Sequence, residues 1–455
     1  MVNNVLLYLL FSFCVICIFF LFPSKYRKYF LAIANALFYY LCEPYFCFLL
    51  LLSMVVTYSI GLGIYSRRNK RDSKILLAIG VAFVVGILGC FKYNGFFVEA
   101  YSGAIQIILP LGLSYYSFRM ISFLVDVYQE KNSMKEISFI DYNIYIAFFP
   151  QIISGPIARI DMLNDSVWKI PLTQKRISDN LGLILSGLFK KLVIAERISG
   201  YTNAVFTNYM DYPALALWMC MFFYAIQLYC DFAGYSEISI GITRLIGFEC
   251  KENFNLPYFS CSVREFWKRW HISLSSWLCD YVYFPLGGNK KGIIRRNINI
   301  LIVFIISGVW HGSTGNFIIW GLFHGFFNIL SSKETADSIL KKATYQICTF
   351  LIVSVGWVIF YFSSLTDALG YLRLMLKDFS ISIEIIISAI MPFTMDYSCF
   401  AHFGVVCIII LLLFIMEMGE YIGKEPNMIC RICLYLVFLI LFGVFGESSF
   451  IYANF

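Results

Sequence analysis

The length, composition and charge of this chain exclude an ordinary soluble protein. Of its 455 residues, 60% are hydrophobic, 19% aromatic and only 14% charged, whereas charged residues make up roughly a quarter of a soluble domain. The formal net charge of +7 does not indicate nucleic-acid binding, because the lysines and arginines lie in short clusters between apolar runs, where they set membrane topology.

The apolar runs are continuous and do not alternate, which predicts an all-α, polytopic helical membrane protein and not a barrel. The first run, Asn3 to Phe22, is long enough to span a bilayer. It lacks a basic leader and a small-residue cleavage site, so we expect a transmembrane helix and not a signal peptide. Further spans are expected near residues 29–44, 46–64 and 75–91.

Two basic clusters predict the orientation. They lie near residues 25–28 and 67–74, and both fall on the cytoplasmic side if the turn at Glu43 and Pro44 is outside. The N-terminus is then expected outside the cytoplasm.

Two apolar stretches are interrupted by proline and glycine. One begins at Leu109 and contains Pro110, Gly112 and Arg119; the other covers residues 148–156. Freed backbone groups and a buried charge must be satisfied by protein or water. We therefore expect the first to pack inside the bundle and the second to be a bent or re-entrant segment, followed by a polar interfacial stretch at 161–179.

The remaining spans are expected at 181–204 and 213–230, and then at 345–363, 381–393, 401–418 and 430–447, which gives about eleven or twelve membrane segments. We find no internal repeat, and predict one integral-membrane domain over residues 1–455. The 15 cysteines include two CxxC pairs, Cys14/Cys17 and Cys430/Cys433, which we interpret as small apolar residues and not as a metal site or a disulfide framework.

Three of the four histidines lie between Tyr229 and Gly325. In this region Asp231 and Glu237 are carboxylates in or near a membrane segment, which is costly unless they are paired or hydrated. Two interpretations stay open: a polar wall of a water-filled cavity, or a structural pairing with Arg244 or Arg264.

The segment from Arg264 to His271 interleaves charges and tryptophans, a composition typical of a helix at the membrane surface. His271 differs from its neighbours because serines follow it, at the boundary between polar and apolar sequence. The loop at 285–292 could hold phosphates, but it lacks the order of a P-loop motif, and a cytoplasmic turn is the favoured interpretation.

His311 follows an apolar run, residues 301–309, whose one hydroxyl is Ser307. A neutral imidazole there could take a proton from an attacking hydroxyl, or it could hydrogen-bond a neighbouring helix; both stay open. We expect His324 to be structural and assign no role to His402.

Six ordered motifs resemble those of the membrane-bound O-acyltransferase family. They are WKRWHISLS at 267–275, DYVYFPLGG at 280–288 and GVWHG at 308–312, supported by YCDFAGYS at 229–236, ENFNLPY at 252–258 and FPQIISGP at 149–156. Together they define a core over about residues 105–330. The resemblance implies a helical fold with a tunnel through a central funnel, with His311 as the catalytic residue and His271 as the second family histidine.

Within the family, the chain resembles the bacterial alginate O-acetylases and peptidoglycan O-acetyltransferases. This implies an O-acetyltransferase of the bacterial cytoplasmic (inner) membrane that takes an acyl group, most simply acetyl from acetyl-CoA, to an extracytoplasmic polysaccharide or a relay acyltransferase. No tightly bound cofactor, metal or nucleic acid is implied. Residues expected to contact substrate or to line the tunnel are Asp231, Tyr235, Asn255, Trp270, Ser273, Ser307 and Trp310.

Two other functions remain open. One is D-alanyl transfer to teichoic acid from a carrier protein, in a similar branch of the family. The other is a proton- or ion-coupled transporter, although the matching halves typical of many transporters are not evident. Direct transfer and a covalent enzyme intermediate are also not distinguished.

Overall fold

The computed structural model describes residues 5–67, 70–93, 109–130, 137–163, 165–331, 338–377, 379–394, 398–424 and 426–445. Over these ranges the regular secondary structure is helical, with no strand, which confirms the predicted class. The described residues form two compact units, one made of 5–184 with 239–252 and the other of 185–238 with 253–445. The prediction of one integral-membrane domain stays a prediction.

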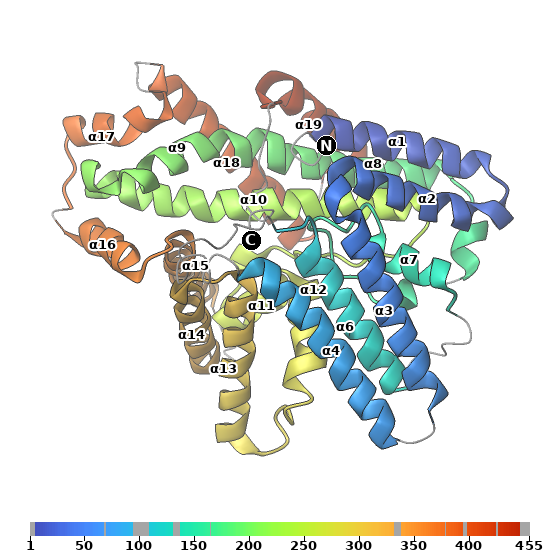
Figure 1. Cartoon of the computed structure of the whole chain (residues 1–455). Helices are drawn as coiled ribbons and strands as arrows, with labels where there is room; N and C mark the ends of the chain where they lie inside the picture. The colour runs from blue at the N-terminus through green and yellow to red at the C-terminus, as the bar shows by residue number, and fades with distance from the viewer. Residues whose placement is uncertain are drawn as a thin grey trace. The chain divides into compact units, whose positions relative to one another are not determined.

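The first unit contains α1 (Val5–Leu21), α2 (Ser24–Cys42), α3 (Cys47–Ser66), α4 (Lys70–Lys92), α6 (Leu113–Tyr128), α7 (Phe139–Ala147) and most of α8 (Gln174–Leu188). Helices α3, α4 and α6 pack against one another and lie side by side (Figure 1).

In the first interrupted stretch the chain becomes helical after Gly112, and the resulting helix α6 is buried along nearly its whole length. Its Arg119 is fully buried, and the guanidinium donates hydrogen bonds to the carbonyl oxygens of Tyr145 at 2.9 Å and Gln151 at 3.2 Å. Backbone carbonyls thus satisfy the charge, and the prediction that this stretch packs inside the bundle is confirmed.

The second interrupted stretch, residues 148–156, is buried and forms turns in place of a helix. Side chains satisfy its backbone: the Phe149 amide donates to Asn35 Oδ1 at 3.0 Å, and Ser239 Oγ donates to the carbonyl of Pro150 at 2.6 Å. This is the bent segment that the two prolines predict, because irregular backbone is tolerated only where protein groups pair with it.

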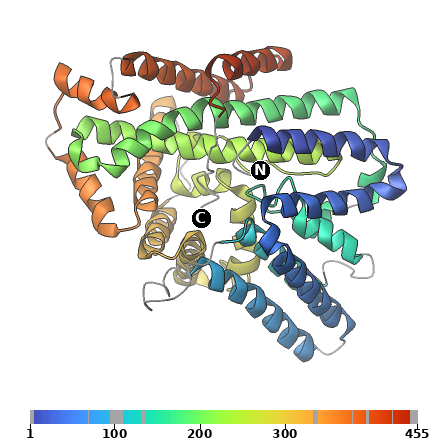
Figure 2. The ribbon, with the colours of Figure 1, turned by 45° about the horizontal axis from the view of Figure 1, so that its top comes forward.

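The second unit contains the remaining helices. After the π-helix η5 (Phe189–Ala195) they are α9 (Glu196–Thr207), α10 (Ala214–Ile246, which continues into the first unit), η7 (Pro257–Phe259), α11 (Val263–Arg269), α12 (Ile272–Leu278), the π-helix η8 (Cys279–Tyr283), α13 (Gly292–His311), α14 (Gly315–Leu330), α15 (Ile339–Tyr361), α16 (Leu365–Leu376), α17 (Ile383–Ile390), α18 (Cys399–Tyr421) and α19 (Met428–Phe442). Helix α16 follows α15 after a short turn and packs against it (Figure 2).

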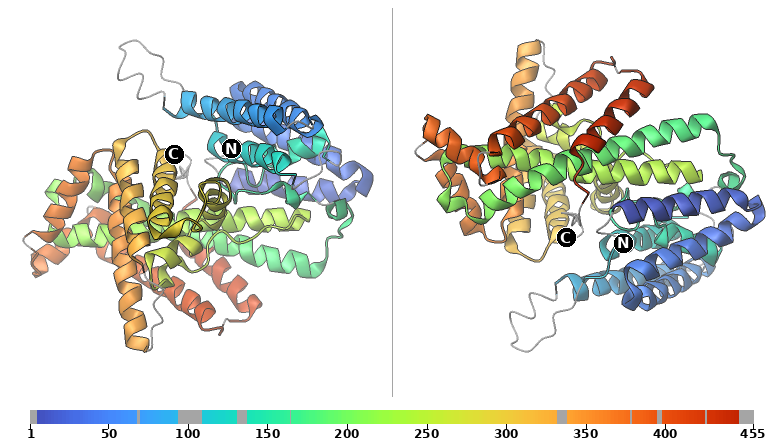
Figure 3. Two further views of the ribbon diagram at one scale, coloured as in Figure 1. Left: turned by 90° about the horizontal axis from the view of Figure 1, so that it is seen from below. Right: turned by 90° about the horizontal axis from the view of Figure 1, so that it is seen from above.

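Glycines bring α13 and α14 into close contact. The two helices form an antiparallel pair with α15 beside α14 (Figure 3). A Cβ added at Gly308 would lie 2.1 Å from the carbonyl oxygen of Phe317, and one at Gly321 would lie 2.3 Å from that of Phe304. Small residues at such positions let helix backbones approach closely, so Gly308 in the GVWHG motif has a packing role.

Replacing Gly321 with alanine is expected to destabilise the protein, because the new methyl group meets backbone and α13 and α14 must separate. Overpacking of this kind costs about 1–3 kcal/mol. The matched control is Gly86→Ala in α4, where nothing lies within 4 Å of the added Cβ and the helix propensity of alanine predicts no loss. Thermal unfolding in detergent measures both, and equal melting temperatures would contradict the close approach.

Among the described residues, six helices are long and apolar enough to cross a membrane, namely Pro44–Ser66, Arg71–Lys92, Ala214–Ile246, Gly292–His311, Ile339–Tyr361 and Cys399–Tyr421, and four shorter helices are also apolar. This is fewer than the predicted eleven or twelve. The predicted spans at 29–44 and 181–204 are helical, but the first helix begins with Lys25, Arg27 and Lys28, and the second contains Lys190 and Lys191.

Candidate functional site

Three histidines of the second unit are buried. His271 is the residue immediately before α12, His311 is the last residue of α13, and His324 lies in α14. Their exposed fractions are 2%, 4% and 0%. Each imidazole is therefore held by packing, and its surroundings determine its chemistry.

A cluster of five tryptophans links these histidines, and we call it the tryptophan cluster: Trp267, Trp270, Trp310, Trp320 and Trp357. The ring of Trp310 lies 4.7 Å from that of His311 and 6.4 Å from that of His271, measured between centroids. The ring of Trp320 lies 5.1 Å from both His311 and His324. Trp310 is thus a neighbour of both His311 and His271.

His311 lies among aromatic side chains. Besides the two tryptophans, Phe360 lies 5.1 Å and Phe317 6.4 Å from it between ring centroids. Ser307 is also buried and lies four residues earlier on α13, so the two side chains share a helix face. A Cβ at Gly312 would lie 2.1 Å from the Phe317 ring, which shows why the residue after His311 is glycine.

His271 is held by a different set of contacts. Its backbone is left-handed, with φ of +44°. Its Nδ1 lies 3.3 Å from Asn253 Oδ1 and 3.4 Å from Ser273 Oγ, and the Phe232 ring lies 4.6 Å away, edge-on. Burial lowers the pKa of His271 to about 3, because a buried site disfavours the charged imidazolium. His271 is therefore neutral at physiological pH.

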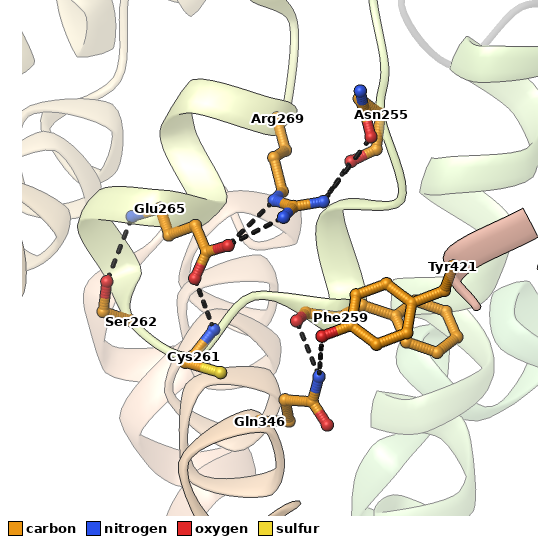
Figure 4. Close-up of polar contacts among 8 residues, drawn as sticks. All are labelled: Asn255, Phe259, Cys261, Ser262, Glu265, Arg269, Gln346 and Tyr421. Carbon is orange, nitrogen blue, oxygen red and sulfur yellow. Dashed lines mark hydrogen bonds and ion pairs between the residues drawn. The ribbon is translucent and has the colours of Figure 1, made fainter. Parts of the chain in front are cut away.

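Of the two asparagines in the ENFNLPY motif, Asn253 contacts the histidine. The Asn255 carbonyl oxygen and Oδ1 both accept from Arg269, at 3.3 and 3.5 Å, and Arg269 also pairs with Glu265 (Figure 4). Asn255 is exposed, and its contacts with Arg269 tie the loop before α11 to the end of that helix. Sequence reasoning selected Asn255 and missed Asn253, although both lie in the same motif.

The other predicted residues lie around these groups. Trp270 packs against Trp357 at 4.9 Å and Phe254 at 5.0 Å between ring centroids. The Ser273 amide donates to Asn253 Oδ1 at 3.0 Å. Tyr235 is buried on α10. Trp270 and Ser273 thus belong to the surroundings of His271.

Asp231 and Glu237 are both in ion pairs with lysines of η5. Lys191 Nζ lies 2.6 Å from Asp231 Oδ1, and Lys190 pairs with Glu237. The predicted partners were wrong: Arg244 donates to the carbonyl of Cys250 at 2.6 Å, and Arg264 to that of Asn328 at 3.1 Å. Both carboxylates thus have ion-pair partners that the sequence did not indicate.

The loop at 285–292 is a glycine-rich turn. Gly287, Gly288 and Gly292 have positive φ, and Asn299 Nδ2 donates to the Gly288 carbonyl at 2.9 Å. No group of three or more histidine, cysteine or acidic side chains in the described ranges could hold a metal ion.

The sequence of this chain is similar to the sequences of known proteins. Residues 128–366, which include the three buried histidines, match the model of the membrane-bound O-acyltransferase family. The chain is 34% identical over 357 residues to a probable alginate O-acetylase of Azotobacter vinelandii, covering 75% of this chain and 71% of the relative. It is 31% identical over 389 residues to the peptidoglycan O-acetyltransferase of Helicobacter pylori, covering 76% and 73%. A teichoic acid D-alanyltransferase of Streptococcus thermophilus is 28% identical over 318 residues, covering 65% and 74%.

Proposed function

The chain belongs to the membrane-bound O-acyltransferase family and is an acyltransferase, and on that premise we propose that it O-acetylates an extracytoplasmic polysaccharide with acetyl from a cytoplasmic thioester. The relatives named for O-acetylation match a larger share of the chain, 75% and 76%, than the relatives named for D-alanyl transfer, 65% and 48%, which supports acetyl as the group moved. The family match supports an enzyme, and we therefore do not propose the transporter that the sequence had left open. The bacterial inner membrane is the location this function requires.

The observation that best supports a mechanism is His311 at the end of α13, buried among aromatic rings. In the proposed reaction His311 takes the proton of an acceptor hydroxyl, and the oxygen attacks the thioester carbonyl. The tetrahedral intermediate then expels the thiolate of the donor, which receives the proton from His311. General-base catalysis of this kind contributes about 10²–10⁴-fold to a rate.

The surroundings of the site fit a reaction that must avoid water. Phe317, Phe360 and the tryptophan cluster give His311 an apolar lining, and exclusion of water limits hydrolysis of a reactive thioester. The proposal requires a tunnel that admits the donor from the cytoplasm and the acceptor from the other face. Ser307 and Trp310 beside His311, and Trp270 and Ser273 beside His271, are its proposed lining.

The donor is tested with the purified protein. We expect label from radiolabelled acetyl-CoA to reach an added polysaccharide or relay acyltransferase with release of free CoA, and no transfer from a D-alanyl carrier protein. The His311→Ala variant serves as the blank for non-enzymatic acetylation. Transfer from the carrier protein but not from acetyl-CoA would replace this proposal with D-alanyl transfer.

A further inference from the structure

Asn253 connects α10 to the segment that contains His271, and its side chain is buried. Only 1% of it is exposed. Its Oδ1 accepts from the Ser273 amide at 3.0 Å, its Nδ2 donates to Ser236 Oγ at 3.1 Å, and its backbone carbonyl accepts from the Ile272 amide at 2.9 Å. The same Oδ1 lies 3.3 Å from Nδ1 of His271.

These contacts determine which way the amide of Asn253 points. A backbone N–H can only donate, so the Asn253 atom that faces the Ser273 amide must be the oxygen. An amide oxygen can only accept, and it faces His271 Nδ1 as well. The Ser273 hydroxyl, 3.4 Å from Nδ1, can accept or donate, so the Asn253 oxygen is the group that discriminates between the tautomers. It favours a hydrogen on Nδ1, and because burial keeps the ring neutral, Nε2 is then the unprotonated nitrogen with a lone pair.

His271 Nε2 is buried and has no hydrogen-bond partner among the described residues. A buried polar atom without a partner is unfavourable, which indicates that a ligand supplies the partner. A lone pair cannot donate to the carbonyl oxygen of a thioester, but it can accept from a hydroxyl. The chemistry of Nε2 thus matches the alcohol substrate and not the acyl group.

We propose that Asn253 is a positioning residue that holds neutral His271 as the Nδ1–H tautomer, so that Nε2 accepts a hydrogen bond from a hydroxyl of the acceptor sugar. A sugar has several hydroxyls, so His271 orients the acceptor through one while His311 takes the proton of another. The identity of the acceptor rests on the proposed function, but the tautomer does not.

The tautomer is measured by ¹⁵N NMR of the full chain labelled at histidine, which gives few ring signals because the chain has four histidines. His271→Ala identifies the signals of His271. We expect a protonated Nδ1 and an unprotonated Nε2 in the wild type. Asn253→Asp keeps an acceptor at the same place and is expected to retain protonated Nδ1, whereas Asn253→Leu is expected to lose this preference. A wild-type ring protonated at Nε2, or unchanged His271 signals in Asn253→Leu, would overturn the inference.

A matched control is Asn299→Leu, which removes another buried asparagine, on α13, whose side chain donates to backbone carbonyls. We expect it to leave the His271 signals unchanged. In transfer assays Asn253→Leu is expected to raise KM for the acceptor by about tenfold, the loss of one hydrogen bond, with KM for acetyl-CoA changed by less than about twofold. Equal changes in both constants would contradict the role in acceptor binding. An inactive wild type with the expected tautomer would overturn the proposed function and leave the role of Asn253 in place.

Discussion

Replacing His311 with alanine is expected to abolish acetyl transfer and to leave the protein folded. The variant removes the proposed base, so the rate should fall by at least about 100-fold. The side chain removed is enclosed by rings of Trp310, Trp320 and Phe360, and the remaining aromatic packing should maintain the α13–α14 pair. Transfer of radiolabelled acetyl, with size-exclusion chromatography in detergent as the check on folding, measures both effects.

His402→Ala is the matched control for His311→Ala. His402 lies in α18, where its Nδ1 is 3.1 Å from the carbonyl of Ser398, and its loss should leave the rate unchanged. His271→Ala should reduce transfer strongly but incompletely, because it removes a group that orients substrate and not the proposed base. A folded His311→Ala protein with the wild-type rate would reject His311 as the base.

The sequence predicts best what local chemistry determines. Pro110 and Gly112 interrupt one apolar run, which was correctly predicted to pack inside the bundle, and Pro150 and Pro156 interrupt another, which was correctly predicted to bend. The length of α10 was not: a span at 213–230 was expected, whereas the helix continues to Ile246. The helix continues through Asp231 and Glu237, whose carboxylates pair with lysines of η5.

Contacts between distant residues are what the sequence could not supply. Asp231 and Lys191 are 40 residues apart, and the partners expected from the sequence were Arg244 or Arg264. The choice between Asn253 and Asn255 depends on the course of a loop and not on residue type. The motifs located His271, His311 and Trp310, but only the structure places both histidine rings beside Trp310.

The second large expected effect is on stability. Asp231→Leu leaves the fully buried ammonium of Lys191 without the carboxylate that now lies 2.6 Å away. Breaking one side of a buried ion pair costs about 3–5 kcal/mol. Glu196, at 3.3 Å from the same ammonium, offsets part of this, so we expect a loss of about 3 kcal/mol, measured as a lower midpoint of thermal unfolding in detergent.

The double variant Lys191→Met/Asp231→Leu separates a structural pair from a hydrated cavity wall. If the pair is structural, removing both charges together should restore most of the stability lost in Asp231→Leu, because apolar replacements of a buried pair are often neutral. If water reaches Asp231, the single variant should cost little and the double should recover nothing. Arg269→Met is the matched control, since its partner Glu265 is more exposed and such pairs contribute about 1 kcal/mol or less. A single Asp231→Leu variant as stable as Arg269→Met would therefore mean that the ion pair with Lys191 does not hold α10 against η5.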